Sequence, residues 1–283
     1  MENLRNMFKL PNSVSISDAD RIAARRLRYE RQVAQENAKE GKLKDYNCSA
    51  CKNKGYISIV AEYDGDYEIR QQTCTVCEKP RRSIANLKNS GLSEVLEKFT
   101  LSNFKAEKDW QKMMLEKAKA FRVQDKVPCF FVGGNSGCGK THLCSALAID
   151  YLRHGSEVRY ILWRKELREI RNQIYDERNE AYLNYLKNVD VLYIDDFFKS
   201  VRTVDEPFQR PTQSDANLAF EIISERLDRG RVTIISTEST IDELIEIDEA
   251  IGSRIKRSSD EYCISLKRDR KKNYRLYKGD LPL

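Results

Sequence analysis

Short apolar runs alternate with longer amphipathic stretches over the last two thirds of the chain. Helical patterns fill the intervals between these runs. Five of the runs have the length and apolar character of buried strands: residues 129–132, 157–162, 189–194, 232–236 and 262–266. Strands that alternate with helices are typical of a parallel sheet covered on both faces. The sequence therefore predicts a three-layer α/β domain built on a five-stranded parallel sheet.

The first third of the chain has a different pattern. Residues 17–39 predict a helix with a narrow apolar stripe, which packs either on its own module or on a partner protein. Residues 56–60 and 67–70 predict two strands, and the Asp64-Gly65 pair between them favours a hairpin turn. A basic helical stretch that ends at Gly91 connects this part to the rest. We therefore expect two domains, residues 1–91 and 92–283.

Composition narrows the class of protein. Of the 283 residues, 33% are charged and 40% are apolar, which is typical of a soluble chain with a densely charged surface. The chain has no run of about 18 apolar residues and no apolar signal-peptide core within residues 1–15, so we expect neither a membrane span nor secretion. A cytoplasmic protein is predicted. In that setting, eight cysteines indicate metal binding or burial rather than disulfides.

The most specific local pattern directly follows the strand predicted at 129–132. It fits G-x-x-x-x-G-K-[ST] at every fixed position, and its residues are Gly134, Asn135, Ser136, Gly137, Cys138, Gly139, Lys140 and Thr141. In such a loop backbone N–H groups wrap the phosphates, the lysine reaches the β- and γ-phosphates, and the threonine hydroxyl ligates Mg²⁺. The N-terminus of the helix predicted at 142–153 also favours anions. The chain is predicted to bind ATP or GTP.

Two acids, Asp195 and Asp196, follow the third predicted strand of the α/β domain. The carboxyl end of a parallel strand lies beside the crevice that receives the phosphates. We expect Asp195 to hold Mg²⁺, directly or through water, and Asp196 to orient or deprotonate the attacking water. The alternative is a pair of solvated acids at a strand end.

Four cysteines in the first third form two Cys-x-x-Cys pairs. Cys48 pairs with Cys51 and Cys74 with Cys77, and the 22 residues between the pairs hold the predicted hairpin. A hairpin brings its two ends together, and four thiolates around one ion favour tetrahedral Zn²⁺ in a closed structural site. Four separately buried cysteines, or a redox pair, are the alternatives. Core packing is expected for the others: Cys129, Cys138, Cys144 and Cys263.

Positive charge is concentrated near the C-terminus. The net charge of the chain is +6, and residues 254–278 contain ten Lys and Arg against three acids. Tyr262, Tyr274 and Tyr277 lie among these charges. A basic segment with tyrosines suits a polyanion whose bases stack on aromatic rings. The alternative is a solvated basic terminus.

Four segments together resemble replicative-helicase loaders of the DnaC/DnaI type. They are the phosphate loop, the strand and acids at 191–197, the segment 99–104 and the Gly-Ser-Arg-Ile at 252–255. These are AAA+ ATPases related to the transposition helper IstB. The resemblance covers about residues 99–266. The cysteine module resembles the zinc-containing N-terminal domain with which such loaders grip a hexameric helicase.

The resemblance implies roles for individual residues. Lys140 and Thr141 match the nucleotide and Mg²⁺ residues, Asp195 matches the metal-associated acid, and Arg254 matches an arginine finger that reaches a neighbouring subunit's nucleotide. Asp196 stands where most AAA+ proteins have Glu, although loaders commonly have Asp. The polar sensor position falls on one of three residues that the sequence does not separate: Ser236, Thr237 and Glu238. Only 17 residues follow Leu266, too few for a helical lid.

The resemblance implies an ATP-dependent loader of the replicative DNA helicase onto single-stranded DNA, in the cytoplasm of a bacterium and possibly encoded by a phage. ATP, Mg²⁺ and Zn²⁺ are the expected cofactors, and self-association through the AAA+ domain is expected. Residues 1–91 bind the helicase in this interpretation, and basic residues that include Arg268, Lys271 and Lys272 contact the DNA. An IstB-like transposition helper and a zinc-ribbon adaptor with a passive nucleotide site are the alternatives.

Overall fold

The chain divides into two compact units, Met1–Glu78 and Lys79–Leu283, which are treated separately below. The domain boundary expected at residue 91 lies outside the described part of the chain. A computed structural model describes residues 18–63, 66–88, 98–172, 177–199, 211–274, 277–278 and 281–282.

A two-stranded antiparallel hairpin forms the centre of the first unit. β1 (Tyr56–Tyr63) pairs with β2 (Asp66–Thr73) in a register that places Tyr56 opposite Thr73. The predicted hairpin is confirmed, while its turn at 64–65 lies outside the described residues. Because the first and last residues of the hairpin face each other, the two Cys-x-x-Cys pairs that flank it are brought to one place.

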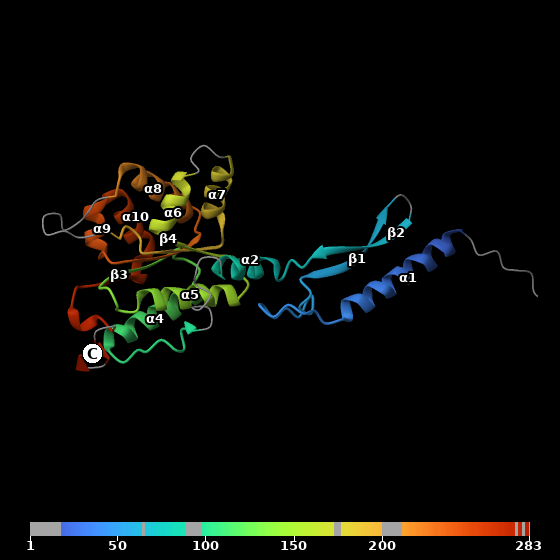
Figure 1. The fold of residues 1–283 in the computed structure, drawn as a ribbon, viewed down its shortest axis with the longest axis horizontal. Helices are drawn as coiled ribbons and strands as arrows, with labels where there is room; N and C mark the ends of the chain where they lie inside the picture. The colour runs from blue at the N-terminus through green and yellow to red at the C-terminus, as the bar shows by residue number, and fades with distance from the viewer. Residues whose placement is uncertain are drawn as a thin grey trace, which may run out of the picture. The chain divides into compact units, whose positions relative to one another are not determined.

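One helix, α1 (Asp18–Ala38), packs along this hairpin (Figure 1). The Asn37 amide donates to the Ser58 carbonyl oxygen at 2.8 Å and accepts from the Ser58 N–H at 2.9 Å. The Arg25 guanidinium lies 2.8 Å from the Asp66 carboxylate. Of the two alternatives for this helix, packing on its own module is therefore observed. Ile22 and Leu27 on the same helix remain 51% and 48% exposed.

The second unit contains the predicted five-stranded parallel sheet, with strand order β4-β5-β6-β3-β7. All five predicted strands are confirmed to within two residues at either end. Their bounds are β3 Cys129–Gly134, β4 Val158–Leu162, β5 Val191–Asp195, β6 Val232–Thr237 and β7 Cys263–Leu266. Since the strands are parallel, the carboxyl ends of β3, β5 and β6 meet at one edge of the sheet.

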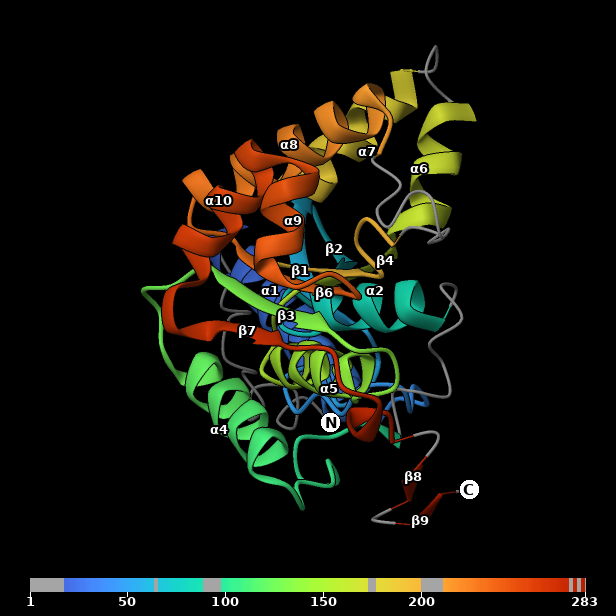
Figure 2. The same ribbon diagram turned by 90° about the vertical axis from the view of Figure 1, so that its left-hand side faces the viewer.

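Helices cover both faces of this sheet, as Figure 2 shows. One face carries α4 (Asp109–Val123) and α5 (Lys140–Arg153). The helices on the other side are α6 Trp163–Asn172, α7 Glu177–Asn188, α8 Gln213–Asp228, α9 Ile241–Ile247 and α10 Glu249–Ser259. The predicted three-layer architecture is confirmed.

At the N-terminal end of the second unit, the predicted connector forms helix α2 (Glu78–Leu87). The Ser83 hydroxyl accepts a hydrogen bond from the Val158 N–H at 2.8 Å, and the Lys79 ammonium lies 3.1 Å from Asp190. These contacts attach α2 to the β4 edge of the sheet.

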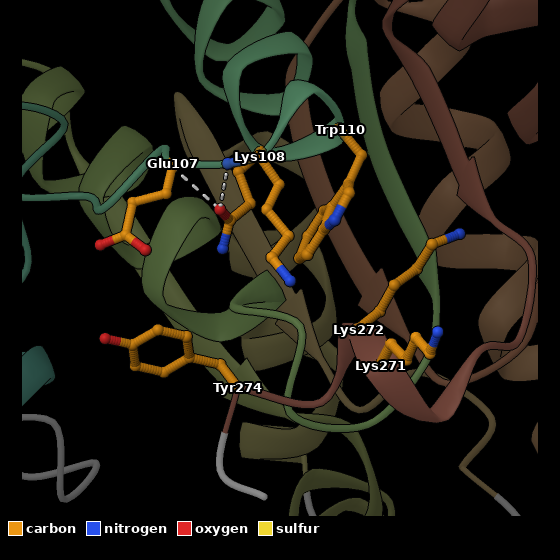
Figure 3. A pocket seen from close by; sticks show the side chains of 7 residues that line it. Glu107, Lys108, Trp110, Lys271, Lys272 and Tyr274 are labelled. Atoms are coloured by element: carbon orange, nitrogen blue, oxygen red, sulfur yellow. Dashed lines mark hydrogen bonds between the residues drawn. The ribbon is translucent and has the colours of Figure 1, made fainter. Parts of the chain in front are cut away.

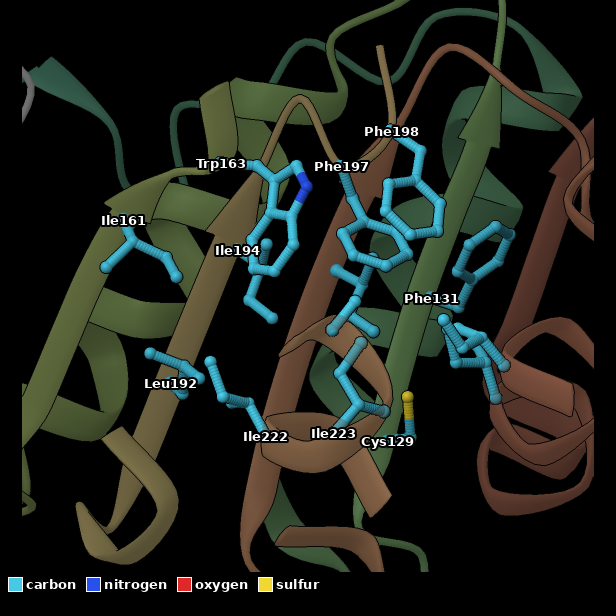
Figure 4. Close-up of a cluster of buried hydrophobic side chains, with 14 of the residues drawn as sticks. Cys129, Phe131, Ile161, Trp163, Leu192, Ile194, Phe197, Phe198, Ile222 and Ile223 are labelled. Atoms are coloured by element: carbon cyan, nitrogen blue, oxygen red, sulfur yellow. The ribbon is translucent and has the colours of Figure 1, made fainter. Parts of the chain in front are cut away.

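The main core lies between the sheet and α8 (Figure 4). Leu192 from β5 and Ile222 from α8 are fully buried there. Three aromatic side chains extend this core to the carboxyl edge of the sheet, where the Trp163 ring contacts Phe197 at 5.2 Å and Phe197 stacks on Phe198 at 4.1 Å between ring centroids. The turn that directly follows β5 is thus anchored in the core.

A buried cation joins three elements at the opposite end of the strands. The Arg226 side chain is completely buried, and its guanidinium donates to the carbonyl oxygens of Leu186, Val189 and Val232 and to the Thr233 hydroxyl. Burial lowers the pKa of Arg226 to about 9. One buried guanidinium thus satisfies three backbone carbonyl groups, and the arginine acts as a structural staple.

After β7 the chain continues as a short 3₁₀ turn (Arg270–Lys272) and a small ribbon of β8 (Tyr277–Lys278) and β9 (Leu281–Pro282). No α-helix occurs among the described residues that follow Leu266. In the described chain, no helix is both long and apolar enough to cross a membrane.

Candidate nucleotide site and cysteine cluster

The predicted phosphate loop connects the end of β3 to the first turn of α5. Gly134 has φ +124°, and a Cβ there would lie 2.2 Å from the Leu266 carbonyl oxygen, so only glycine fits. Gly139 caps α5 with φ +91°, a left-handed conformation that also favours glycine. The backbone conformation therefore requires both fixed glycines of the pattern, and the loop ends at the N-terminus of α5.

Lys140 is buried within the curve of this loop, with 7% of its surface exposed. Its ammonium donates to the carbonyl oxygens of Gly134 at 2.8 Å and Asn135 at 2.6 Å. The side chain thus folds back over the loop from the first helical turn. Its ammonium therefore lies inside the curve of the loop predicted to bind phosphates.

Asp195 at the end of β5 is 5% exposed and is the meeting point of four donors. The Thr141 hydroxyl lies 3.4 Å and the Tyr160 hydroxyl 3.3 Å from its carboxylate, and the Asp196 N–H lies at 3.0 Å. The Ser236 hydroxyl donates to the same carboxylate. The structure therefore brings together Thr141 and Asp195, the two predicted Mg²⁺ residues, from segments 54 positions apart.

Tyr160 and Ser236 are contacts that the sequence did not assign to the acid. Burial, followed by the charge of Asp195, raises the pKa of Tyr160, so its phenol stays protonated and donates. The position of Ser236 is set by the register of β6 beside β5. This register places Ile235 opposite Ile194, so the next residues, Ser236 and Asp195, are also neighbours. Neither residue carries a local sequence signal for this role, because the contacts depend on which strands are neighbours.

The turn after Asp195 has an unusual backbone. Asp196 has φ +51°, a left-handed conformation that is rare outside glycine and costs free energy that the surrounding structure must supply. Its carboxylate lies 3.1 Å from the Lys199 ammonium, which also lies 3.2 Å from Glu238. Partial burial opposes the charge of Lys199, but Asp196 and Glu238 raise its pKa. Asp196 is thus aimed away from the interior and held beside a lysine.

The three sensor candidates occupy different places. Ser236 contacts Asp195, as described above, and Thr237 donates to the Phe197 carbonyl oxygen at 2.7 Å. Glu238 lies at a surface pocket of about 420 Å³ that also includes Asn135 and Ser136 of the loop. Ser236 is therefore the one of the three whose side chain touches the predicted metal acid, and Glu238 the one that faces the pocket.

Arg254 lies on the opposite face of the sheet, on α10. Its guanidinium donates to the Asp228 carboxylate at 2.8 Å and lies 5.4 Å from the Phe220 ring centroid. The side chain is about one third exposed, and Asp228 is 63% exposed. The structure thus places Arg254 on the surface, away from the loop of its own chain.

The C-terminal segment, defined here as residues 267–274, crosses the outer rim of the phosphate loop. The Asn135 amide donates to the Asp269 carbonyl oxygen and accepts from the Asp269 N–H at 3.0 Å. The Tyr274 N–H donates to the Gly137 carbonyl oxygen at 2.9 Å. Both contacts use the side chain or carbonyl of a loop residue, and the Asn273 side chain also lies against Gly137. The sequence carried no signal for this contact.

Two aromatic residues and a histidine lie beside the N-terminus of α5. The His142 ring stacks on Phe99 with centroids 4.2 Å apart and meets the edge of Phe104 at 5.3 Å. Burial lowers the pKa of His142, so the ring tends to be neutral. The segment that contributes to the family resemblance at 99–104 therefore packs directly against the nucleotide loop.

The four cysteines of the first unit form one buried cluster. Their Sγ atoms all lie within 4.8 Å of one another, with Cys48 and Cys74 at 3.9 Å and Cys51 and Cys77 at 3.6 Å. A zinc tetrahedron with Zn–S bonds of about 2.3 Å has S–S edges of about 3.8 Å. The donor set and its spacing therefore fit Zn²⁺.

The backbone around the cluster also suits thiolates. Lys52 and Asn53 have φ of +48° and +64°, which bends the chain after Cys51 so that the Gly55 N–H points to the Cys51 sulfur at 3.3 Å. Burial opposes ionisation, but this hydrogen bond and the neighbouring thiols lower the pKa of Cys51 to about 7. Cys129, Cys138 and Cys144 are buried in the second unit, as expected, and Cys263 is half-buried there.

A parallel sheet with this loop, and with a threonine and an acid converging beside it, defines a P-loop ATPase of the AAA+ class. The model of the family described as "IstB-like ATP binding protein" matches residues 74–252. The chain belongs to this family and binds ATP.

Related sequences come from Bacillus subtilis (strain 168). The protein YqaM, described as uncharacterized, is 26% identical over 298 residues, which is 90% of this chain and 91% of YqaM. The phage-like element PBSX protein XkdC is 33% identical over 135 residues, or 47% of this chain and 48% of XkdC.

Solved structures share the fold of the second unit. A structure titled DnaI has a TM-score of 0.50 and 20% identity, covering 62% of this chain and 92% of that one. The DnaC helicase loader has a TM-score of 0.50 and 18% identity, covering 62% and 98%. The replication initiator DnaA bound to AMPPCP and single-stranded DNA has a TM-score of 0.51 and 20% identity, covering 64% and 53%.

Proposed function

We propose that this protein loads a ring-shaped replicative DNA helicase onto single-stranded DNA and that ATP controls the step. The observation that carries the proposal is the pairing of an assembled AAA+ nucleotide site with a separate compact unit built around four cysteines. The fold likeness of the ATPase unit to DnaI and to the DnaC helicase loader supports it. In this proposal the first unit holds the helicase and the second controls its release.

The nucleotide site contributes binding and charge stabilisation. The loop N–H groups and Lys140 bind the phosphates, and Thr141 with Asp195 would hold Mg²⁺, whose charge would offset that of the transferring phosphoryl group. Tyr160 and Ser236 donate to Asp195 and so orient its carboxylate. Asp196, fixed by its turn beside Lys199, positions the attacking water. The reaction transfers the γ-phosphoryl group of ATP to that water.

Arg254 acts between subunits in this proposal. It lies on the surface and forms an ion pair with the exposed Asp228, and exposed ion pairs are weak. On subunit contact, Arg254 therefore leaves Asp228 and binds the phosphates of the nucleotide on the neighbouring subunit. An arginine supplied in trans stabilises charge that develops during phosphoryl transfer. Hydrolysis therefore depends on assembly, which suits a release timer better than a continuous motor.

The first unit has the surface of a docking module. Large apolar side chains are exposed on α1, on the hairpin and beside the cysteine cluster: Ile22, Leu27, Leu43, Ile59, Tyr63 and Val76. The α1 surface around Leu27 also contains Arg28 and Arg31. Exposed apolar residues rimmed by arginines are typical of a protein-interaction site. We infer that Zn²⁺ holds this small unit rigid while α1 binds the helicase.

Capture of the host's replicative helicase hexamer by the full-length chain, with and without ATP, tests the proposal. Leu27→Asp is expected to abolish capture and leave ATP binding intact. Val123→Asp is the matched control, because Val123 is an 85% exposed apolar residue on the ATPase unit. If the wild-type chain captures no helicase with ATP and none without ATP, the loader function is refuted.

Membership of the IstB-like family favours one second candidate, a transposition helper that delivers duplex DNA to a transposase. ATP-dependent filaments on duplex DNA, with no preference for single strands, would support that function. A third outcome, nucleotide binding with no turnover at any protein concentration, would indicate an adaptor with a passive nucleotide site.

A further inference from the structure

A small pocket forms where the start of α4 meets the C-terminal segment (Figure 3). Lys108 and Trp110 lie along one side, and Lys271, Lys272 and Tyr274 along the other. These two sides come from sequence positions about 160 residues apart, and together they hold two aromatic rings and three lysines. We name it the Trp110/Tyr274 pocket.

The backbone that carries the two rings is fixed, and both side chains are partly exposed. The Gln111 side-chain oxygen accepts from the N–H groups of Glu107 and Lys108 at 3.0 and 2.9 Å, which fixes the turn that presents Trp110. Trp110 is half-buried, and Tyr274 is 36% exposed. The Tyr274 backbone is fixed by its hydrogen bond to Gly137. Partly exposed aromatic side chains on a fixed backbone provide surfaces on which a flat ligand stacks.

The charge around this pocket is positive. Residues 267–274 contain five Lys and Arg and one acid, Asp269, whose carboxylate caps the turn through the Lys271 N–H at 2.9 Å. Arg268 is engaged by Glu243 at 2.9 Å. By contrast, the side chain of Lys271 has no ion pair within the described residues. The charge available to a ligand therefore comes chiefly from the lysines that line the pocket, opposed by Glu107 alone among the lining residues.

These features favour one kind of ligand. A single strand of nucleic acid presents phosphates to lysines and unpaired bases to aromatic rings, and both contacts tolerate any sequence. An acidic peptide would satisfy the lysines but leave both rings uncovered. A duplex hides its bases from flat rings at its surface.

We propose that the Trp110/Tyr274 pocket binds a single strand of nucleic acid and that the C-terminal segment links this binding to the nucleotide site. This inference rests on the proposed function and names the residues through which the protein contacts DNA. The link is physical, because the segment that carries Lys271, Lys272 and Tyr274 is bonded to Asn135 and Gly137 of the phosphate loop. A shift of the loop on binding ATP moves one side of the pocket, and the coupling must be reciprocal.

Fluorescence of the full-length chain provides the first test. The chain has two tryptophans, and Trp163 is 1% exposed, so quenching by a ligand reports Trp110. Short oligothymidine is expected to quench this signal, and Trp110→Ala is expected to weaken oligonucleotide affinity about 10-fold. Quenching by ATP alone, with none by oligothymidine, would assign the pocket to the nucleotide's own base and overturn the proposal.

The salt dependence of oligonucleotide affinity compares a lysine that lines the pocket with one that does not. Lys271→Ala is expected to reduce the slope of log affinity against log salt by about 0.7, the value for one phosphate contact on a single strand. Lys119→Ala is the control, because Lys119 is exposed on α4 but does not line the pocket. Equal slopes for both variants would contradict the assignment. Comparison of DNA with RNA oligonucleotides identifies which strand is preferred.

Asn135→Ala tests the link, since it removes both hydrogen bonds to Asp269. The ratio of oligonucleotide Kd values with and without a non-hydrolysable ATP analogue is expected to differ from one in the wild type and to approach one in the variant. A ratio that Asn135→Ala does not change refutes the link. Helicase capture separates the two proposals: a chain that captures helicase but binds no strand loses only this inference, whereas one that captures no helicase loses the loader function.

Discussion

The four-cysteine cluster allows the sharpest test of how this protein is built. We expect removal of Zn²⁺ by a strong chelator, or the Cys74→Ser substitution, to unfold the first unit and leave the second folded. The reason is the composition of the core. Among the described residues of the first unit, the buried cluster consists of Cys48, Cys51, Cys74 and Cys77, and the partly buried hydrophobic residues packed against it are Tyr46 and Ile57.

The magnitude follows from this small core. Full burial of a side chain such as Ile57 contributes about 1.5–3 kcal/mol, whereas each ordered residue costs about 1–2 kcal/mol of backbone entropy. Most side chains of β2 are half-buried or exposed, so the hairpin adds little apolar burial. Binding of structural zinc contributes about 10–16 kcal/mol at neutral pH, which is the term that folds the unit.

Zinc content and hydrogen exchange measure the outcome. The wild type is expected to hold one equivalent of zinc, and Cys74→Ser is expected to lose most of it together with amide protection in β1 and β2. Cys263→Ser is the control, because Cys263 is a half-buried cysteine of the second unit. Protection of the hairpin in the chelated protein at the level of the zinc-loaded protein would refute the reasoning. ATP binding is expected to survive in both variants, because the nucleotide site lies wholly in the second unit.

Three further substitutions test the second unit. Lys140→Ala is expected to weaken ATP binding about 10- to 100-fold through loss of charged hydrogen bonds to the phosphates, measured by calorimetry; unchanged affinity contradicts its role. Arg254→Ala is expected to keep ATP affinity and lower turnover about 1,000-fold, and mixing with Lys140→Ala is expected to restore part of the turnover if the arginine acts in trans. Arg226→Met is expected to lower the free energy of unfolding by about 3–5 kcal/mol, because three backbone carbonyl groups lose their donor; denaturation showing a change within about 0.5 kcal/mol would disprove the staple.

Local patterns were sufficient wherever a few neighbouring residues determine the structure. The phosphate loop requires glycine at positions 134 and 139 because of its own backbone angles, so the requirement is visible in the sequence. The strands were found because each buried strand must be apolar over its own length. The two Cys-x-x-Cys pairs were placed together because a hairpin necessarily joins its ends.

The packing of α1 is a feature that the local sequence pattern could not predict. Its apolar stripe was compatible with two partners, and polar contacts with the hairpin identified the one observed: Asn37 pairs with the backbone of Ser58, and Arg25 pairs with Asp66. Similarly, the sequence left Ser236, Thr237 and Glu238 equivalent. The register of β6 beside β5 then separated them, because it decides which hydroxyl reaches Asp195.

By itself, then, the sequence determined that this chain binds a nucleoside triphosphate on an α/β scaffold and carries a four-cysteine module, since these properties arise from residues close together along the chain. The tertiary structure alone decided the strand order, the donors around Asp195, the surface position of Arg254 and the attachment of the C-terminal segment to the phosphate loop. Those depend on contacts between residues separated by whole crossovers, such as Asn135 and Asp269. Spacing along a chain does not encode which distant segments become neighbours, because burial of the entire core selects them.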